Sequence, residues 1–271
     1  MRNIPLRIVY EDNYIIVIEK KEGLLSIGTA KGKDEMTAHS LLCNYVRNTA
    51  PRRGRYAPPP RVFIVHRLDR ETSGLMVFAK SEEIKRALQE NWDKAVTERK
   101  YVAVVNGDLS GRGEQGGAGK EQQPGKERQM GKEQQGQQLP FGTIRSWLKE
   151  NSAFIVYSSP KDNGGQLAIT NYRVLGSNPK SRKSLVELEL ETGRKNQIRV
   201  HMQELDAPIY GDKKYFCNSQ QHLMENKKAR RLYLHAYKLS FIHPVTGKEM
   251  KFSTPIPFSF RSIISLSQQP Y

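Results

Sequence analysis

The stretch "HRLDRETSGL", residues His66–Leu75, lies between two apolar runs and sets the fold prediction for this chain. The run "RVFIV" leads into it and "LMVFAK" leads out of it, as two strands of a sheet would. Asp69 stands at its centre. A carboxylate on a short loop from a packed sheet is held in a fixed position, as a catalytic group must be. The alternative is that Asp69 only shapes a polar turn, or pairs with Arg67 or Arg70.

Outward from this stretch, strand-like segments dominate the chain. Helical spacing of apolar residues predicts helices near 37–46, 81–92 and 195–205, the first two with Thr37 and Ser81 as N-caps. Strands and helices do not alternate regularly, so we expect an α+β protein with a large, mostly antiparallel sheet. The predicted strands are residues 7–10, 14–20, 61–65, 75–80, 100–107, 141–144, 153–158, 167–175 and 185–192, with a final pair in 232–255.

One segment of the 271 residues stands apart in composition. From 111 to 138, Gly and Gln make up 16 of 28 residues, and "GKEQQ"-like units recur. A tract with so few apolar side chains cannot offset its ordering entropy by burial, so we expect a disordered insertion. The chain as a whole (1–271) is predicted to be a single domain that this insertion interrupts. An RNA-binding arm is the functional alternative for the tract.

The charge balance indicates a polyanionic partner. Lys and Arg number 44 against 28 Asp and Glu, a formal net charge of +16, and basic clusters occupy several loops. Nucleic acid satisfies this excess most simply. No apolar run is long enough to span a bilayer, and the N-terminal residues lack the apolar core of a secretory signal. With two well-separated cysteines, Cys43 and Cys217, we expect a cytoplasmic protein with reduced thiols and no membrane partner.

Two further segments carry candidate functional residues. In "ETGRKNQIRVHM", Arg194 and Arg199 could bind a carboxylate bidentately, and Arg194 or Lys195 could bind a phosphate at a helix start. In "RKYVAVV", Tyr101 could stack on a base and exchange a proton. The alternatives are a solvated helix surface for the arginines and a strand-filling aromatic for Tyr101.

These blocks together resemble the RluA family of RNA pseudouridine synthases. "HRLDRETSGL" is similar to the family's catalytic loop, with Asp69 at the position of its catalytic aspartate. The resemblance continues in order through the blocks "VYEDNYIIVIEKKEGLLS", "RKYVAVVNG", "AITNYRVL", "ETGRKNQIRVHM", "DAPIYGDKKY" and "LHAYKLSFIHPVTG". The chain departs from the family at Asn196, where His is frequent, and at Lys21, where Pro is common. We expect no S4-type RNA-binding module before the first hairpin.

The resemblance implies the pseudouridine synthase fold, with a bent mixed sheet and a central RNA-binding cleft. It implies isomerisation of a flipped-out uridine in ribosomal or transfer RNA, without cofactor or metal, by a monomer that needs no protein partner. Asp69 would add to the ribose C1′ or assist removal of a 2′ proton, and both routes remain open. Arg199 would pair with Asp69, and Tyr101 would pack on the uracil and help remove the C5 proton. The predicted RNA contacts are Arg67, Arg70, Lys100, Arg194 and Lys195.

Two other functions remain open from the sequence. The same fold could bind RNA without catalysis, although Asp69, Tyr101 and Arg199 are all present. A glycoside or nucleoside hydrolase would need a second acidic group, because water must be activated. Glu71 is near Asp69 in sequence, but in an extended loop its side chain would point away.

Overall fold

The computed structural model describes residues 6–28, 35–49, 59–90, 92–110, 140–216, 226 and 228–264. The predicted insertion at 111–138 and Cys217 lie outside these residues. The chain forms two compact units, Met1–Val102 with Glu225–Pro257, and Ala103–Met224 with Phe258–Tyr271. The expectation that the whole chain is one domain stays a prediction.

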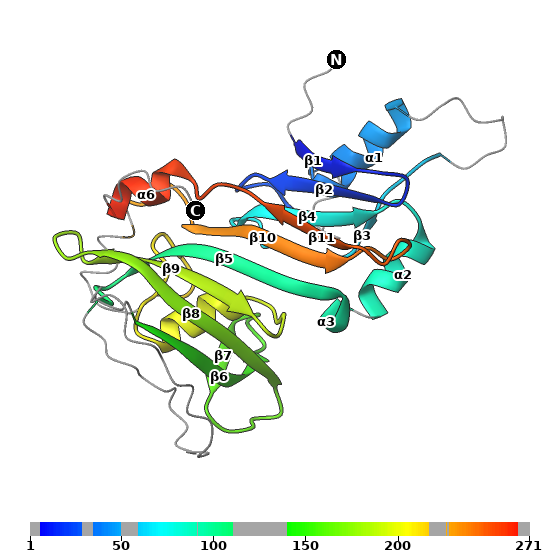
Figure 1. Ribbon diagram of the computed structural model, residues 1–271. Coiled ribbons are helices and arrows are strands. Elements are labelled where there is room, and N and C mark those ends of the chain that lie inside the picture. The colour runs from blue at the N-terminus through cyan, green and yellow to red at the C-terminus, as the bar shows by residue number, and fades with distance from the viewer. Residues whose placement is uncertain are drawn as a thin grey trace, which may run out of the picture. The chain divides into compact units, whose positions relative to one another are not determined.

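The first unit is built on a sheet whose strands follow the order β1, β2, β4, β10 (Figure 1). The predicted N-terminal hairpin is confirmed: β1 (Arg7–Glu11) pairs antiparallel with β2 (Ile15–Lys20), which pairs antiparallel with β4 (Ser73–Ala79). Only β10 (Leu234–Ile242) runs parallel to β4 among the strand pairs described for this unit. The strand β3 (Phe63–Ile64) pairs with β4, and β11 (Glu249–Ser253) pairs with β10.

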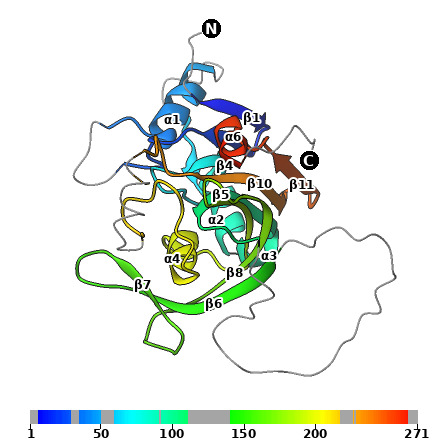
Figure 2. The same ribbon diagram turned by 90° about the vertical axis from the view of Figure 1, so that its left-hand side faces the viewer.

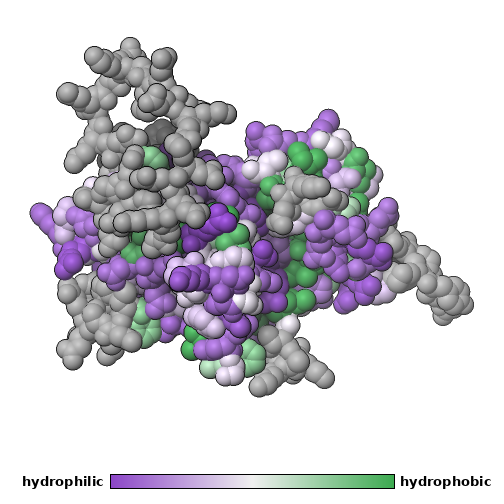
Figure 3. All heavy atoms as spheres, turned by 90° about the horizontal axis from the view of Figure 1, so that it is seen from below, coloured by the Kyte–Doolittle hydropathy of each residue, from purple (hydrophilic) through white to green (hydrophobic). Residues whose placement is uncertain are grey.

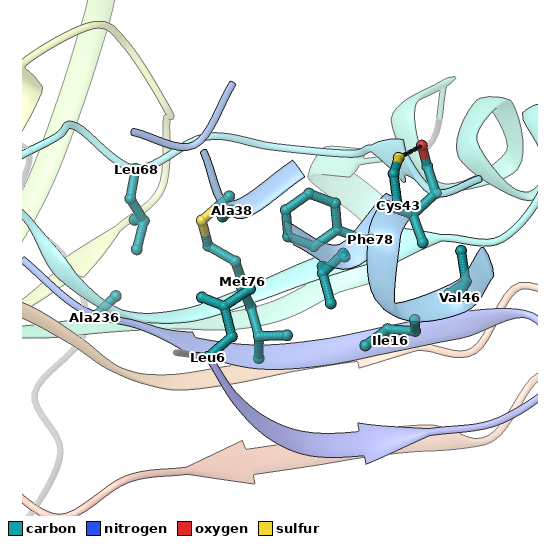
Figure 4. Close-up of a cluster of buried hydrophobic side chains, with 12 residues drawn as sticks. Leu6, Ile16, Ala38, Cys43, Val46, Leu68, Met76, Phe78 and Ala236 are labelled. Carbon is teal, nitrogen blue, oxygen red and sulfur yellow. Dashed lines mark hydrogen bonds between the residues drawn. The ribbon is translucent and has the colours of Figure 1, made fainter. Parts of the chain in front are cut away.

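Helices cover both faces of this sheet, which explains why β4 is buried along its whole length. Alternate residues of β2 and β4 face α1 (Ala38–Thr49), which adds Leu42, Cys43 and Val46 to that core (Figure 4). The intervening residues of the same two strands face α2 (Glu82–Glu90), which adds Ile84 and Leu88 to a second core. Cys43 is a free, buried thiol.

The predicted N-caps are confirmed at both helices. The Thr37 hydroxyl accepts the Ser40 N–H at 3.0 Å, and the Ser40 hydroxyl accepts the Thr37 N–H at 2.9 Å, a reciprocal cap. The Ser81 hydroxyl accepts the Ile84 N–H at 3.2 Å. The second helix is shorter than predicted, because Trp92 belongs to a separate turn, α3 (Trp92–Ala95).

The second unit is a four-stranded antiparallel array packed on α4 (Gln197–Glu204) (Figure 2). Its order is β9, β8, β6, β7, and their bounds are Lys183–Leu190, Gln166–Asn178, Phe141–Glu150 and Val156–Ser159. Leu148, Ala168, Val200 and Tyr215 share its core. The long strand β5 (Val96–Asn106) contributes residues to both units.

The helix at the C-terminal end of the described residues was not predicted. The helix α6 (Phe258–Ile264) belongs to the second unit and packs against β8 and β9, where the Asn178 side chain donates to the Ile263 carbonyl at 3.2 Å. Apart from this helix, the helices and strands confirm the predicted α+β class with mainly antiparallel pairing. Among the described residues, no helix is long and apolar enough to cross a bilayer.

Candidate active site

The loop that carries Asp69 is fixed on both sides of that residue. The Ser26 hydroxyl donates to the Leu68 carbonyl at 2.7 Å, and the Leu68 N–H donates back to the same hydroxyl at 3.2 Å. The Arg70 carbonyl accepts the Gly23 N–H at 2.9 Å. Leu68 itself is buried in the α1 core, whereas Asp69 is half-buried. The segment after β2 therefore presents Asp69 at a partly open position on a rigid backbone.

Lys20 is a buried cation beneath this loop. Its Nζ donates to the carbonyls of Lys21 (3.0 Å), Leu24 (2.7 Å) and Arg70 (3.1 Å). Burial lowers the pKa of Lys20 to about 8, and the negative charge of Asp69 acts in the opposite direction, raising it. Lys20 thus both ties the Asp69 loop to β2 and supplies a positive charge close to the Asp69 carboxylate.

The end of the loop is joined to β10 through Ser73 and Gly74. Gly74 has φ +123, and a Cβ there would lie 2.2 Å from the Ala236 carbonyl oxygen, so only glycine permits this approach. The Ser73 hydroxyl lies 2.7 Å from His235 Nδ1 and accepts a hydrogen bond from Arg231 Nη2 at 2.6 Å. Arg231 also pairs with Glu22 at 2.9 Å, which adds a second, largely buried cation to this region.

Tyr101 lies on β5 and packs partly against the α1 core. Burial raises the pKa of the Tyr101 phenol to about 12; the nearby Arg99 lowers it and the nearby Asp69 raises it. The coupling places Tyr101 within electrostatic range of Asp69. A phenol with this pKa carries its proton at neutral pH. It can therefore accept a proton from the substrate only if it gives up its own proton in the same step.

The remaining candidates of this unit differ in their surroundings. Arg67 and Arg70 are exposed, and Arg70 forms an ion pair with Glu35. Lys100 pairs with Glu98 at 3.0 Å. His66 has a structural role: its Nε2 accepts the Val77 N–H at 3.2 Å, and its ring lies 4.9 Å from that of Trp92. Burial lowers the pKa of His66 to about 3, with a smaller contribution in the same direction from the charge of Arg99.

In the second unit, Arg199 is held from three sides. Its Nε and Nη2 donate to the two carboxylate oxygens of Asp212 at 2.7 and 2.8 Å. Its Nη1 donates to the Asn196 side-chain oxygen at 3.3 Å, and its guanidinium lies 4.9 Å from the centre of the Tyr215 ring. The predicted pairing of Arg199 with Asp69 joins residues of different units and stays a prediction.

The departure from the family at Asn196 has a definite local role. Asn196 adopts a left-handed backbone with φ 56 before α4, and its side chain donates to the Tyr215 hydroxyl at 3.0 Å. Its side-chain oxygen accepts the bond from Arg199, so Asn196 links Arg199 to Tyr215. The neighbouring Arg194 and Lys195 are exposed, and Lys195 pairs with Glu150.

Sequence reasoning missed Lys20, Ser26, Arg231 and Asp212. A signal for Lys20 was available, because it follows Ile16 and Ile18 at two-residue spacing and therefore shares their core-facing side of β2. Asp212 offered no such signal, since its partner Arg199 lies 13 residues away on another element. The sequence indicated the residue types, and the fold supplies the pairing.

Comparisons with known proteins identify the family of this chain. A family described as RNA pseudouridylate synthase matches residues 14–204. The chain is 30% identical over 258 residues to ribosomal large subunit pseudouridine synthase D of Zymomonas mobilis, covering 94% of this chain and 71% of that protein. It is 33% identical over 263 residues to the protein of the same name from Vibrio cholerae, covering 94% and 69%.

Solved structures show the same fold. The human RNA pseudouridylate synthase domain containing 4 superposes with a TM-score of 0.66 at 24% identity, over 97% of this chain and 95% of that one. The human domain containing 1 gives 0.65 at 21% identity, over 96% and 88%. With the family match, the relatives and the fold in agreement, the chain belongs to the RNA pseudouridine synthases, in the RluA family.

Proposed function

We propose that this protein converts uridines of ribosomal RNA to pseudouridine, with Asp69 as its catalytic residue. The observation that carries the proposal is the position of Asp69 between Leu68 and Arg70, whose backbones are both hydrogen-bonded to the segment after β2. A half-buried carboxylate on a backbone fixed at both neighbours can keep the short, aligned approach that a reaction at a ribose requires.

The reaction retains all atoms of the substrate. The glycosidic bond between N1 and C1′ breaks, the uracil turns within the site, and a bond forms between C5 and C1′. Asp69 starts the reaction either by adding to C1′ or by assisting loss of a 2′ proton. Tyr101 packs on the uracil and takes part in removal of the C5 proton, which moves to N1 overall by way of solvent or site groups. Arg199 orients Asp69.

The target uridine reaches Asp69 when it flips out of the base stack of the RNA, which costs a few kcal/mol. Basic residues offset this cost through phosphate contacts, and we assign that role to Arg67, Arg70, Lys100, Arg194 and Lys195. Ribosomal RNA is favoured as the target because the relatives at 30–33% identity are named for the large ribosomal subunit. We place the enzyme in the cytoplasm as a monomer.

The proposal is tested by mapping pseudouridines in total RNA from a strain with the gene and from a strain that lacks it. One or more positions in ribosomal RNA should carry pseudouridine only in the first strain, and restoring the intact gene should restore them. Identical maps would refute the proposal. Release of free uracil from RNA by the purified protein would instead indicate a hydrolase.

A further inference from the structure

The connection between β6 and β7 displays an aromatic side chain on a strained backbone. Phe154 is 71% exposed and has φ 59, in the left-handed region that a bulky residue rarely occupies. On the face drawn in Figure 3, hydrophilic residues cover much of the coloured surface and apolar residues form smaller patches. Strain of this kind persists only where surrounding contacts enforce it, and it concentrates at functional positions.

Hydrogen bonds of both its N–H and its carbonyl hold the backbone of Phe154 in this conformation. Its N–H donates to the Asn151 carbonyl at 2.9 Å, and its own carbonyl accepts the Lys214 Nζ at 2.7 Å. The Asn151 side-chain oxygen accepts the N–H groups of Ala153 and Ile155 at 3.0 and 2.9 Å. The turn therefore holds the ring outward in a defined position.

Two lysines contact Phe154. The Lys195 Nζ lies 5.9 Å from the ring centre and is paired with Glu150. Lys214, which bonds the Phe154 carbonyl, is exposed, as is its neighbour Lys213. Lys149 is exposed on β6, with its Nζ donating to the Asn163 carbonyl at 3.0 Å. Lys195 and Lys214 thus contact the ring and the carbonyl of Phe154, and Lys149 and Lys213 are further exposed cations of the same unit.

An exposed aromatic face among lysines matches single-stranded RNA. Every base has a face that can stack on such a ring, and flanking amines bind the phosphates on either side. Ile155 and Tyr157, which follow Phe154 closely in sequence, are also exposed, but the cores of protein–protein interfaces are depleted of lysine. The charge around Phe154 therefore favours RNA as its occupant.

We propose that Phe154 is a stacking platform for one unpaired base of the substrate RNA other than the target uridine, and that Lys195 and Lys214 bind the adjacent phosphates. The proposal rests on the proposed RNA substrate and adds a recognition site in the second unit. The left-handed turn has the role of presenting the ring.

The test measures binding of a short single-stranded RNA that carries 2-aminopurine, whose fluorescence falls when it stacks on a ring. Phe154→Ala should weaken binding about ten-fold and reduce the quenching, the effect of losing one stacked base. Phe154→Trp should keep both. Phe258→Ala is the matched control, because Phe258 is 76% exposed on α6 in the same unit; it should bind like the unchanged protein.

A further variant separates recognition from stability. Phe154→Gly removes the left-handed strain, so its melting temperature should be equal to or above that of the unchanged protein while RNA binding falls about ten-fold. Wild-type affinity in Phe154→Ala, or an equal loss in Phe258→Ala, would overturn the platform. Failure of the proposed function is distinguishable, because the unchanged protein would then form no pseudouridine in ribosomal RNA whatever Phe154 does.

Discussion

Arg199 and Asp212 form a bidentate ion pair in which Nε and Nη2 donate to the two carboxylate oxygens at 2.7 and 2.8 Å. The Asp212 carboxylate is fully buried, and its Oδ1 also accepts the N–H groups of Lys214 and Tyr215 at 2.8 and 2.9 Å. Asp212 therefore fixes both the guanidinium and the backbone that follows it. The arginine predicted to orient Asp69 has its own carboxylate anchor within its unit.

Asp212→Ala should lower the free energy of unfolding by about 3–5 kcal/mol, because it leaves the Arg199 charge without its buried partner. Asp212→Asn should cost less, since an amide oxygen can still accept the two backbone N–H groups. Urea denaturation measures both effects. Glu191→Ala, which removes an exposed carboxylate of the same unit, is the control and should change stability little. Equal stability of Asp212→Ala and this control would refute the anchoring role.

Lys20 should give the protein a distinctive dependence of stability on pH. Its pKa is lowered from 10.5 to about 8 in the folded chain, so the unfolded chain binds more protons between these values. The contribution of Lys20 to the free energy of unfolding should therefore rise with pH across that window, by on the order of 3 kcal/mol.

The measurement compares the unchanged protein with Lys20→Met from pH 7 to 11. The stability difference between them should shift in favour of the unchanged protein as pH rises. Lys21→Met, at the exposed neighbouring lysine, should show a constant difference. Parallel curves for the unchanged protein and Lys20→Met would contradict the burial of a charged lysine below the Asp69 loop.

Gly74→Ala should disrupt the contact between β4 and β10. The added Cβ would lie 2.2 Å from the Ala236 carbonyl oxygen at φ +123, so both strain and a backbone clash result. We expect a loss of about 3 kcal/mol or more in the free energy of unfolding. Gly247→Ala, at φ +67 with no atom within 4 Å of the added Cβ, should cost only about 1 kcal/mol. Similar losses in the two variants would show that no close approach exists at Gly74.

Tyr101→Phe should bind RNA with unchanged affinity and slow turnover about 100-fold, because the ring remains and the proton-transferring hydroxyl is lost. Since burial raises the Tyr101 pKa to about 12, the pH profile of turnover should show no tyrosine ionisation between pH 6 and 9. Tyr45→Phe is the control, as that hydroxyl bonds Glu11 at 2.8 Å on the surface. Unchanged turnover in Tyr101→Phe would remove its role in proton transfer.

The local features of the fold were predictable from the sequence. Thr37 and Ser81 precede helical apolar spacing and cap the helices as expected, because capping depends only on neighbouring residues. The C-terminal helix α6 was not predicted, since seven residues carry little periodicity. Likewise, the run "RVFIV" gives only the two-residue strand β3, because pairing with β4 and not strand propensity sets its extent.

For the site, the sequence indicated which residues matter but few of their contacts. Asp69 and Tyr101 were identified by the blocks that contain them, and their electrostatic coupling agrees with a shared site. The contact of Ser26 with Leu68 spans 42 residues, and that of Lys20 with Arg70 spans 50. Hydrogen bonds over such separations depend on the folded chain, which explains why the supporting residues of the Asp69 loop were missed.

The catalytic role of Asp69 is tested most directly by measuring whether Asp69→Asn forms pseudouridine. The substitution keeps the size of the side chain and removes its charge, and the hydrogen bonds that fix the loop involve Leu68 and Arg70. The purified variant would be mixed in excess with ribosomal RNA from the strain that lacks the gene, and pseudouridine measured by mass spectrometry. We expect an intact unfolding transition, wild-type RNA affinity and no pseudouridine. Turnover near that of the unchanged protein would contradict the catalytic role.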